Sequence, residues 1–241
     1  MNTTSVSPAD QPSRTATGRP VLVWDAPVRL THWLMVFSFA GAYLTAESEH
    51  WRLVHVTLGY TLAGLVGFRV LWGFFGTRYA RFANFVRGPA AVADYLRDLL
   101  ARRPPHHVGH NPAGALAILV LLGLAALVTG TGWATYEELG GKWLEELHEG
   151  AANLMLAVVG VHVAGVLVSG WLHGDNLVGA MITGHKPVRP EDGVRRAWRG
   201  VAALLLAAVL AFWALQWWTA PTAGSTAGPT VSARHNDRDD D

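Results

Sequence analysis

Five long runs of apolar residues restrict what this chain can fold into more than any other feature. The runs cover residues 30–46, 53–75, 111–136, 150–172 and 201–218. An α-helix of about 20 apolar residues crosses the hydrocarbon core of a bilayer. Charged residues make up only 15% of the sequence, against about 25% in soluble domains. The sequence therefore predicts an all-α membrane protein with five transmembrane helices.

The polar segments divide the chain into four parts. Residues 1–20 and 219–241 are polar, and the first of them lacks the apolar core of a signal peptide. We expect both to be disordered tails. Residues 21–190 then form the main transmembrane domain, and residues 191–218 add one further transmembrane helix.

The loops between the runs differ in charge. Six arginines lie between residues 78 and 110, and four arginines and a lysine lie between residues 185 and 199. The two other loops, at 47–49 and 137–149, are rich in glutamate. Because basic loops remain on the cytoplasmic side, we expect a multi-pass membrane protein with its N-terminus in the cytoplasm. Proline and glycine breaks also predict an amphipathic surface helix near residues 89–102.

Composition excludes several classes of function. The 19 Lys and Arg balance the 18 Asp and Glu, so the chain has no large excess of positive charge that would attract nucleic acid. The chain has no cysteine, which excludes disulfides, cysteine-bound iron–sulfur clusters and covalently attached c-type haem. Metal chemistry must therefore use the 11 histidines, the methionines or the carboxylates.

Four histidines lie within or at the edges of the apolar runs, where polar side chains are costly and usually face a cofactor, a partner or a pathway. They are His32, His55, His148 and His162. His148 and His162 are 14 residues apart, which gives about 21 Å of helix rise and nearly the same helix face. A hydrocarbon core about 30 Å thick accommodates two porphyrins at that spacing.

The expected topology sorts these histidines into two pairs. His32 and His162 lie toward the cytoplasmic side, and His55 and His148 lie toward the outer side. Neutral imidazoles on facing helices are suitable axial ligands for b-type haem, and helix-bundle cores are where such cofactors bind. We expect most of the other histidines to be solvated, and His110 to cap the third apolar run.

Three arginines accompany the histidines. Arg29 and Arg52 each precede a predicted ligand by three residues and so share its helix face, where a guanidinium can pair with a haem propionate. Arg69 follows His55 by 14 residues and is expected near the inner haem. An equally simple interpretation is that Arg29 and Arg52 anchor helix ends at the lipid headgroups.

Short motifs around these residues occur in a characteristic order. They are Arg29-Leu30-Thr31-His32-Trp33, His55-Val56-Thr57-Leu58-Gly59-Tyr60, Phe68-Arg69-Val70-Leu71-Trp72-Gly73, Leu147-His148-Glu149 and Val161-His162-Val163. In this order and spacing the chain resembles the bacterial di-haem cytochrome b-561 family, which is related to the cytochrome b subunits of membrane-bound nickel–iron hydrogenases. The resemblance covers roughly residues 20–190.

The resemblance implies a transmembrane four-helix bundle with two non-covalent haems b, located in the bacterial inner (cytoplasmic) membrane. His32 and His162 would bind one haem, and His55 and His148 the other, while electrons pass across the membrane to or from quinone. Besides membrane lipid, the implied partners are quinone and a periplasmic redox protein or oxidoreductase subunit. The fifth apolar run lies outside the four-helix core of the family.

Other functions remain open from the sequence. Some proteins of the same fold oxidise superoxide and reduce quinone. A haem-free proton or metal transporter lined by histidines is a second alternative, although the runs contain almost none of the acidic residues that it needs. A third is a structural anchor that docks a soluble partner through the basic loop or the fifth helix.

Overall fold

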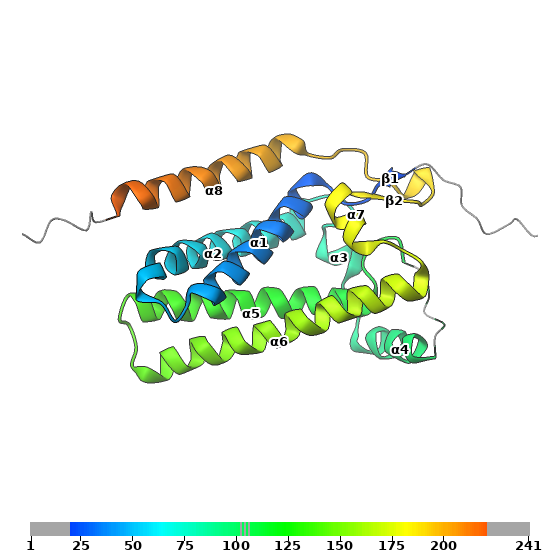
Figure 1. Cartoon of the computed structure of the whole chain (residues 1–241). Helices are drawn as coiled ribbons and strands as arrows, with labels where there is room; N and C mark the ends of the chain where they lie inside the picture. Colours follow the sequence, from blue (N-terminus) through cyan, green and yellow to red (C-terminus); the bar gives the residue numbers. More distant parts are fainter. Residues whose placement is uncertain (1–19, 102, 104, 106, 221–241) are drawn as a thin grey trace, which may run out of the picture.

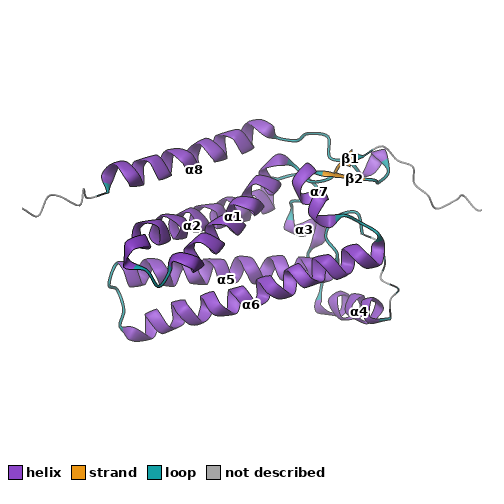
Figure 2. Ribbon diagram, viewed as in Figure 1, coloured by secondary structure: helices purple, strands orange, loops and turns teal. Residues whose placement is uncertain are grey.

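A computed structural model describes residues 20–101, 103, 105 and 107–220 of the chain. Within these residues the fold is helical, apart from one pair of two-residue strands (Figures 1 and 2). The all-α prediction is therefore confirmed, and the small antiparallel ladder of β1 (Val21–Leu22) and β2 (His185–Lys186) is an addition to it. The predicted tails lie outside the described residues, except for residues 20, 219 and 220.

The first helical hairpin consists of α1 (Ala26–Thr45), the short 3-10 helix η1 (Glu49–Trp51) and α2 (Arg52–Phe75). The Asp25 side chain caps α1 by accepting a hydrogen bond of 2.8 Å from the Val28 N–H. Proline in the first turn of α1 costs no hydrogen bond, because the first N–H groups of a helix have no partner within it. The two apolar runs at 30–46 and 53–75 thus become antiparallel neighbours.

The second hairpin consists of α5 (Pro112–Tyr136) and α6 (Lys142–His173). The Asn111 side chain caps α5 by accepting a 2.7 Å hydrogen bond from the Gly114 N–H. This cap corrects the prediction for His110, because the neighbouring asparagine carries the oxygen that a helix N-terminus needs.

Helix α6 is longer than the apolar run at 150–172 from which it was predicted. It begins at Lys142, and three of the glutamates expected in a loop lie within its first eight residues. Leu144 in the first turn is buried, and its side chain lies beside Gly140. The helix ends at Gly174, whose positive φ of 68° suits the absence of a Cβ.

The hairpins pack so that α2 contacts α5, with α1 and α6 on either side of that contact (Figure 1). The chain reversals after α1 and α5 lie together at one end, here called the acidic end because it holds the glutamate-rich segments 47–49 and 137–149. The opposite end, called the basic end, holds the strands and α7 (Leu177–Thr183). Also at this end are α3 (Phe82–Phe85) and α4 (Pro89–Leu100), the surface helix expected near 89–102.

Four helical segments are long and apolar enough to cross a membrane. They are Glu49–Phe75, Pro112–Tyr136, Lys142–His173 and Arg199–Thr219. Helix α1 lies alongside α2 but is less apolar, because Arg29 and His32 occupy its first two turns. The molecule is thus a multi-pass membrane protein, and the crossing by α1 stays a prediction.

A buried carboxylate organises the basic end. Asp25 is 0% exposed. One of its oxygens caps α1, and the other accepts hydrogen bonds from Trp72 Nε1 at 3.1 Å and Thr77 Oγ1 at 2.6 Å. Arg69, buried nearby, supplies an opposite charge. These contacts fix the start of α1 against the end of α2, because a buried carboxylate must keep its partners.

The fifth long helix, α8 (Arg199–Thr219), lies outside the bundle against α1 and α2 (Figure 1). Its Trp213 indole donates a 2.8 Å hydrogen bond to Thr61 Oγ1 of α2 and packs beside Phe37 of α1. Most of the helix surface is otherwise exposed in the isolated chain. Helix α8 is therefore an addition to the side of the bundle rather than part of its core.

Candidate functional site

The histidines near the acidic end, His55 on α2 and His148 on α6, face each other. Their ring centroids are 6.3 Å apart, and the ring planes are nearly perpendicular, at 78°. His55 Nδ1 is 2.8 Å from the Ala42 carbonyl oxygen, and His148 Nδ1 is 2.9 Å from the Val128 carbonyl oxygen. Each Nδ1 therefore donates its proton to a carbonyl, which leaves both Nε2 atoms as free electron-pair donors.

This arrangement suits a single metal ion held between two imidazoles. A metal–imidazole bond is about 2 Å long, and the ring centre lies about 1 Å beyond the nitrogen, so two opposed ligands have centroids about 6 Å apart. The observed separation is 6.3 Å. A metal-binding histidine also usually donates its second N–H to a carbonyl or carboxylate, which fixes its tautomer and orientation. The pair therefore fits axial ligation of a haem iron.

Gly132 on α5 makes room for the His148 ring. A Cβ atom at this position would lie 2.8 Å from His148 Cε1 and 3.1 Å from its Nδ1. Thr131, the preceding residue, places its hydroxyl oxygen 3.3 Å from the same Nδ1. Two adjacent residues of α5 thus set the position of this imidazole.

The basic-end pair, His32 on α1 and His162 on α6, interacts electrostatically. His32 Nδ1 is buried and has no hydrogen-bond partner in the described part of the chain. A buried polar atom left in this way indicates a missing ligand or solvent group. The orphaned nitrogen, the neighbouring histidine and the helix positions all fit a second haem, for which these two residues are the candidates.

An apolar layer lies midway between the two pairs. Phe39 follows His32 by seven residues, and Leu62 follows His55 by seven. Met155 is seven residues from both His148 and His162, which places it two helical turns from each. All three side chains belong to the main buried cluster of the bundle. The two candidate sites are thus separated by packed side chains.

The helices that carry the paired histidines are not the ones in closest backbone contact. Among the described residues, α1 packs along α2, α5 along α6 and α2 along α5. Each histidine pair instead joins α6 to α1 or to α2. A Cβ atom added at Gly59 on α2 or at Gly160 on α6 would have no atom within 4 Å.

The three arginines have different surroundings. Arg29 is half-buried, its Nε has no hydrogen-bond partner among the described residues, and its Nη1 lies at the Gly184 turn. Arg69 is buried, donates to the Ala80 carbonyl at 3.2 Å and lies over the Phe82 ring. The Arg52 side chain is 65% exposed, and its Nη1 lies 3.8 Å from Glu49 Oε2. Position therefore favours Arg29 as the propionate partner and gives no support to Arg52.

His110 is a feature that sequence reasoning missed. It lies just before α5, with its ring 4.6 Å from both the Trp24 and the Phe85 rings. Burial lowers its pKa to about 3, and the nearby charges of Arg69, Lys186 and His162 act in the same direction. Its Nδ1 is buried without a partner. The only sequence signal was its place beside a helix-capping asparagine, which does not reveal burial.

The buried His110 should make the protein less stable in acid. In the unfolded chain this histidine takes up a proton near pH 6.5, whereas in the folded chain it does so only near pH 3. The destabilisation is therefore absent above pH 6.5 and grows below it by up to about 1.4 kcal/mol per pH unit.

Between pH 7.5 and pH 5, we expect the thermal unfolding midpoint of His110→Phe to fall less than that of the wild-type chain. The matched control is His185→Phe, because His185 is exposed. An unchanged slope for His110→Phe would contradict this account of its burial.

No group of three or more His, Asp or Glu side chains arranged to hold a bare metal ion occurs in the part of the chain that the structure describes. Paired histidines remain, and two axial ligands are what a haem iron needs because the porphyrin supplies the other four. The donor set therefore suits haem better than an isolated metal ion.

Comparison with known proteins agrees with this chemistry. The sequence model of a family described as prokaryotic cytochrome b561 matches residues 23–184. The match includes all four paired histidines and ends before α8. No solved protein structure matches the chain.

Several curated relatives are similar to the chain. A protein of Azotobacter chroococcum mcd 1 is 34% identical over 158 residues, which are 53% of this chain and 65% of the relative. One of Bradyrhizobium diazoefficiens is 26% identical over 230 residues, 75% of this chain and 92% of the relative. Both carry the name "Probable Ni/Fe-hydrogenase B-type cytochrome subunit". The chain thus spans slightly less than two thirds of the Azotobacter protein.

Proposed function

The chain belongs to the prokaryotic cytochrome b561 family, and from this premise we propose that it is a di-haem cytochrome that carries electrons across the membrane. Membership makes it a membrane-bound b-type cytochrome with a role in electron transfer. The number of haems, their ligands and the redox partners are the proposal. When bound, haem b supplies one-electron redox chemistry.

The single observation that carries the proposal is the arrangement of His55 and His148. Their ring separation of 6.3 Å and their Nδ1 contacts with two carbonyls supply a pair of oriented Nε2 donors. His32 and His162 are proposed as the second pair, supported by the buried Nδ1 of His32. A haem-free transporter does not account for two imidazoles held in this way.

In the proposed function, residues of the chain orient the haem ligands, neutralise the haem propionates and separate the two haem sites. The Ala42 and Val128 carbonyls hold the imidazole tautomers, which increases ligand basicity. Arg29 offers a cationic group beside the basic-end pair. The layer of Phe39, Leu62 and Met155 excludes water between the two sites, so that each potential is set by its own surroundings.

The proposed partners lie at opposite ends of the bundle. The relatives are named as subunits of nickel–iron hydrogenases, and we propose that this chain likewise exchanges electrons with an oxidoreductase subunit or redox protein in the periplasm. The quinone pool is the proposed second partner. The glutamate-rich acidic end would face the periplasm, because basic segments remain in the cytoplasm.

A reduced-minus-oxidised spectrum of the detergent-purified chain, with a haem assay per chain, tests the proposal. We expect about two low-spin haems b per chain, as two bis-histidine sites require. One haem per chain would contradict one of the two pairs. A colourless protein from haem-sufficient cells would contradict both and favour a transporter or an anchor.

A further inference from the structure

A groove of about 360 Å³ lies at the basic end, between the surface helix α4 and the start of α5. Its walls are apolar side chains from both helices, among them Val92, Leu96, Leu116 and Leu119. Arg87, just before α4, is the one charged residue among the described residues that line it. The volume falls within the range of about 300–1,000 Å³ that ligand pockets usually have.

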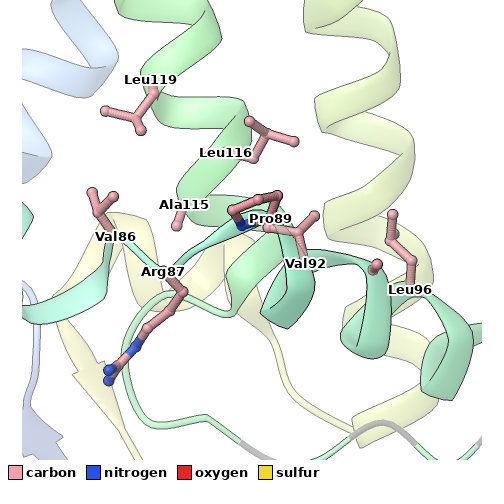
Figure 3. Close-up of a pocket in the computed structure, with 9 residues that line it drawn as sticks. Val86, Arg87, Pro89, Val92, Leu96, Ala115, Leu116 and Leu119 are labelled. Atoms are coloured by element: carbon pink, nitrogen blue, oxygen red, sulfur yellow. The ribbon is translucent and has the colours of Figure 1, made fainter.

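The groove is apolar along its length and charged at one end. In Figure 3, Leu116 of α5 lies beside Pro89 and Val92, and Leu119 lies farther along α5, whereas the Arg87 guanidinium points away from these side chains. A ligand that fits this arrangement has a hydrocarbon part beside α5 and an anionic group beside Arg87. That description matches an anionic amphiphile.

The surroundings favour lipid as the source of such a ligand. Leu96, Leu116 and Leu119 are between 40% and 48% exposed in the isolated chain, which suits contact with acyl chains. Arg81 and Arg87 are exposed near the start of α4. Amphipathic helices with basic residues lie in the membrane interface, and anionic headgroups bind to such sites.

Acidic residues do not oppose an anion at this place. No carboxylate lines the groove among the described residues. Asp94, on the same helix, pairs with Arg97 at 2.9 Å, which neutralises both charges. Among the residues that the structure describes, Arg87 forms no ion pair, so its charge remains available to a ligand.

We propose that this groove is a binding site for one anionic phospholipid, with an acyl chain between α4 and α5 and the phosphate beside Arg87. The bound lipid fills the space between the surface helix and the bundle and thereby holds α4 against α5. This site is separate from the histidine pairs and does not depend on the proposed electron-transfer function.

Native mass spectrometry of the purified haem-loaded chain tests the site, with phosphatidylglycerol and phosphatidylcholine of identical acyl chains as probes. We expect the wild-type chain to retain one phosphatidylglycerol with a preference of about fivefold or more over phosphatidylcholine. One cationic side chain near a membrane surface contributes about this factor. Arg87→Gln should therefore reduce the preference about fivefold, and Arg87→Lys should keep it.

The matched control is Arg97→Gln, which removes the same charge from α4 but affects a side chain already paired with Asp94. It should leave the preference unchanged. Val92→Trp fills the groove and should abolish retention of both lipids, while an unchanged haem spectrum shows that the chain has folded.

Other occupants give different results. Inorganic phosphate should not displace the lipid at millimolar concentration, and displacement would assign the site to a free anion instead. Displacement by an isoprenoid quinone would assign it to quinone. Equal retention of the two lipids, or a preference that survives Arg87→Gln, would overturn the proposal.

Discussion

His148→Ala is expected to remove about half of the bound haem, because a low-spin b-type haem loses one of its two axial ligands. His148 is held by the Val128 carbonyl and faces His55 at 6.3 Å, so no other histidine on the same helix can replace it there. The haem that remains should keep its midpoint potential, since the layer of Phe39, Leu62 and Met155 separates the two sites.

His162→Ala provides the complementary measurement. It should also remove about half of the haem. The surviving haem should be the one that His148→Ala eliminates, so a redox titration should give the two variants different midpoint potentials. His50→Ala is the control, because His50 is exposed and lies close in sequence to His55. Loss of both haems from either substitution alone would contradict the pairing.

Gly132→Val is expected to displace a haem without changing any ligand. A Cβ at Gly132 would already lie 2.8 Å from His148 Cε1, so the valine side chain must push the imidazole from its position. Loss of the contacts that orient a metal ligand usually lowers the affinity for the metal about 10-fold to 100-fold. We therefore expect haem content to fall toward that of His148→Ala, with Gly132→Ala intermediate.

Gly130→Val is the matched control for this substitution. Gly130 lies on the same helix, and a Cβ there has no neighbour within 4 Å. Both changes alter the helix propensity of α5 equally. Haem spectra and haem content of the two variants distinguish a steric effect on His148 from a general effect on the helix. Equal haem loss in both would rule out the steric explanation.

The helices could be predicted from sequence because their signals are local. Apolar runs long enough to span a bilayer predicted α2, α5, α6 and α8, and the proline-bounded amphipathic stretch predicted α4. The predicted start of α6 was wrong because the helix also includes the glutamate-rich residues from Lys142, among which Leu144 is buried. Burial of a single leucine in a polar segment depends on tertiary packing.

The candidate site, like the helices, could be predicted from the sequence only in part. Spacing on one helix placed His148 and His162 on a common face, and alternating chain direction paired them with His55 and His32. The surroundings of Arg52 and His110 were not accessible to this reasoning. Arg52 shares a helix face with His55 but extends to Glu49 and solvent, whereas His110, from a polar loop, is enclosed by Trp24 and Phe85.

The class of protein, the helical segments, the absence of thiol chemistry and the positions of the four histidines could all be predicted from the amino-acid sequence. These properties follow from composition and helical periodicity, which act within one segment. Three other features became visible only in the packed fold: Ala42 and Val128 orient two imidazoles, Gly132 leaves room for one of them, and α4 and α5 enclose a groove. Each of these depends on atoms from segments distant in the chain, whose distances are fixed when the helices pack.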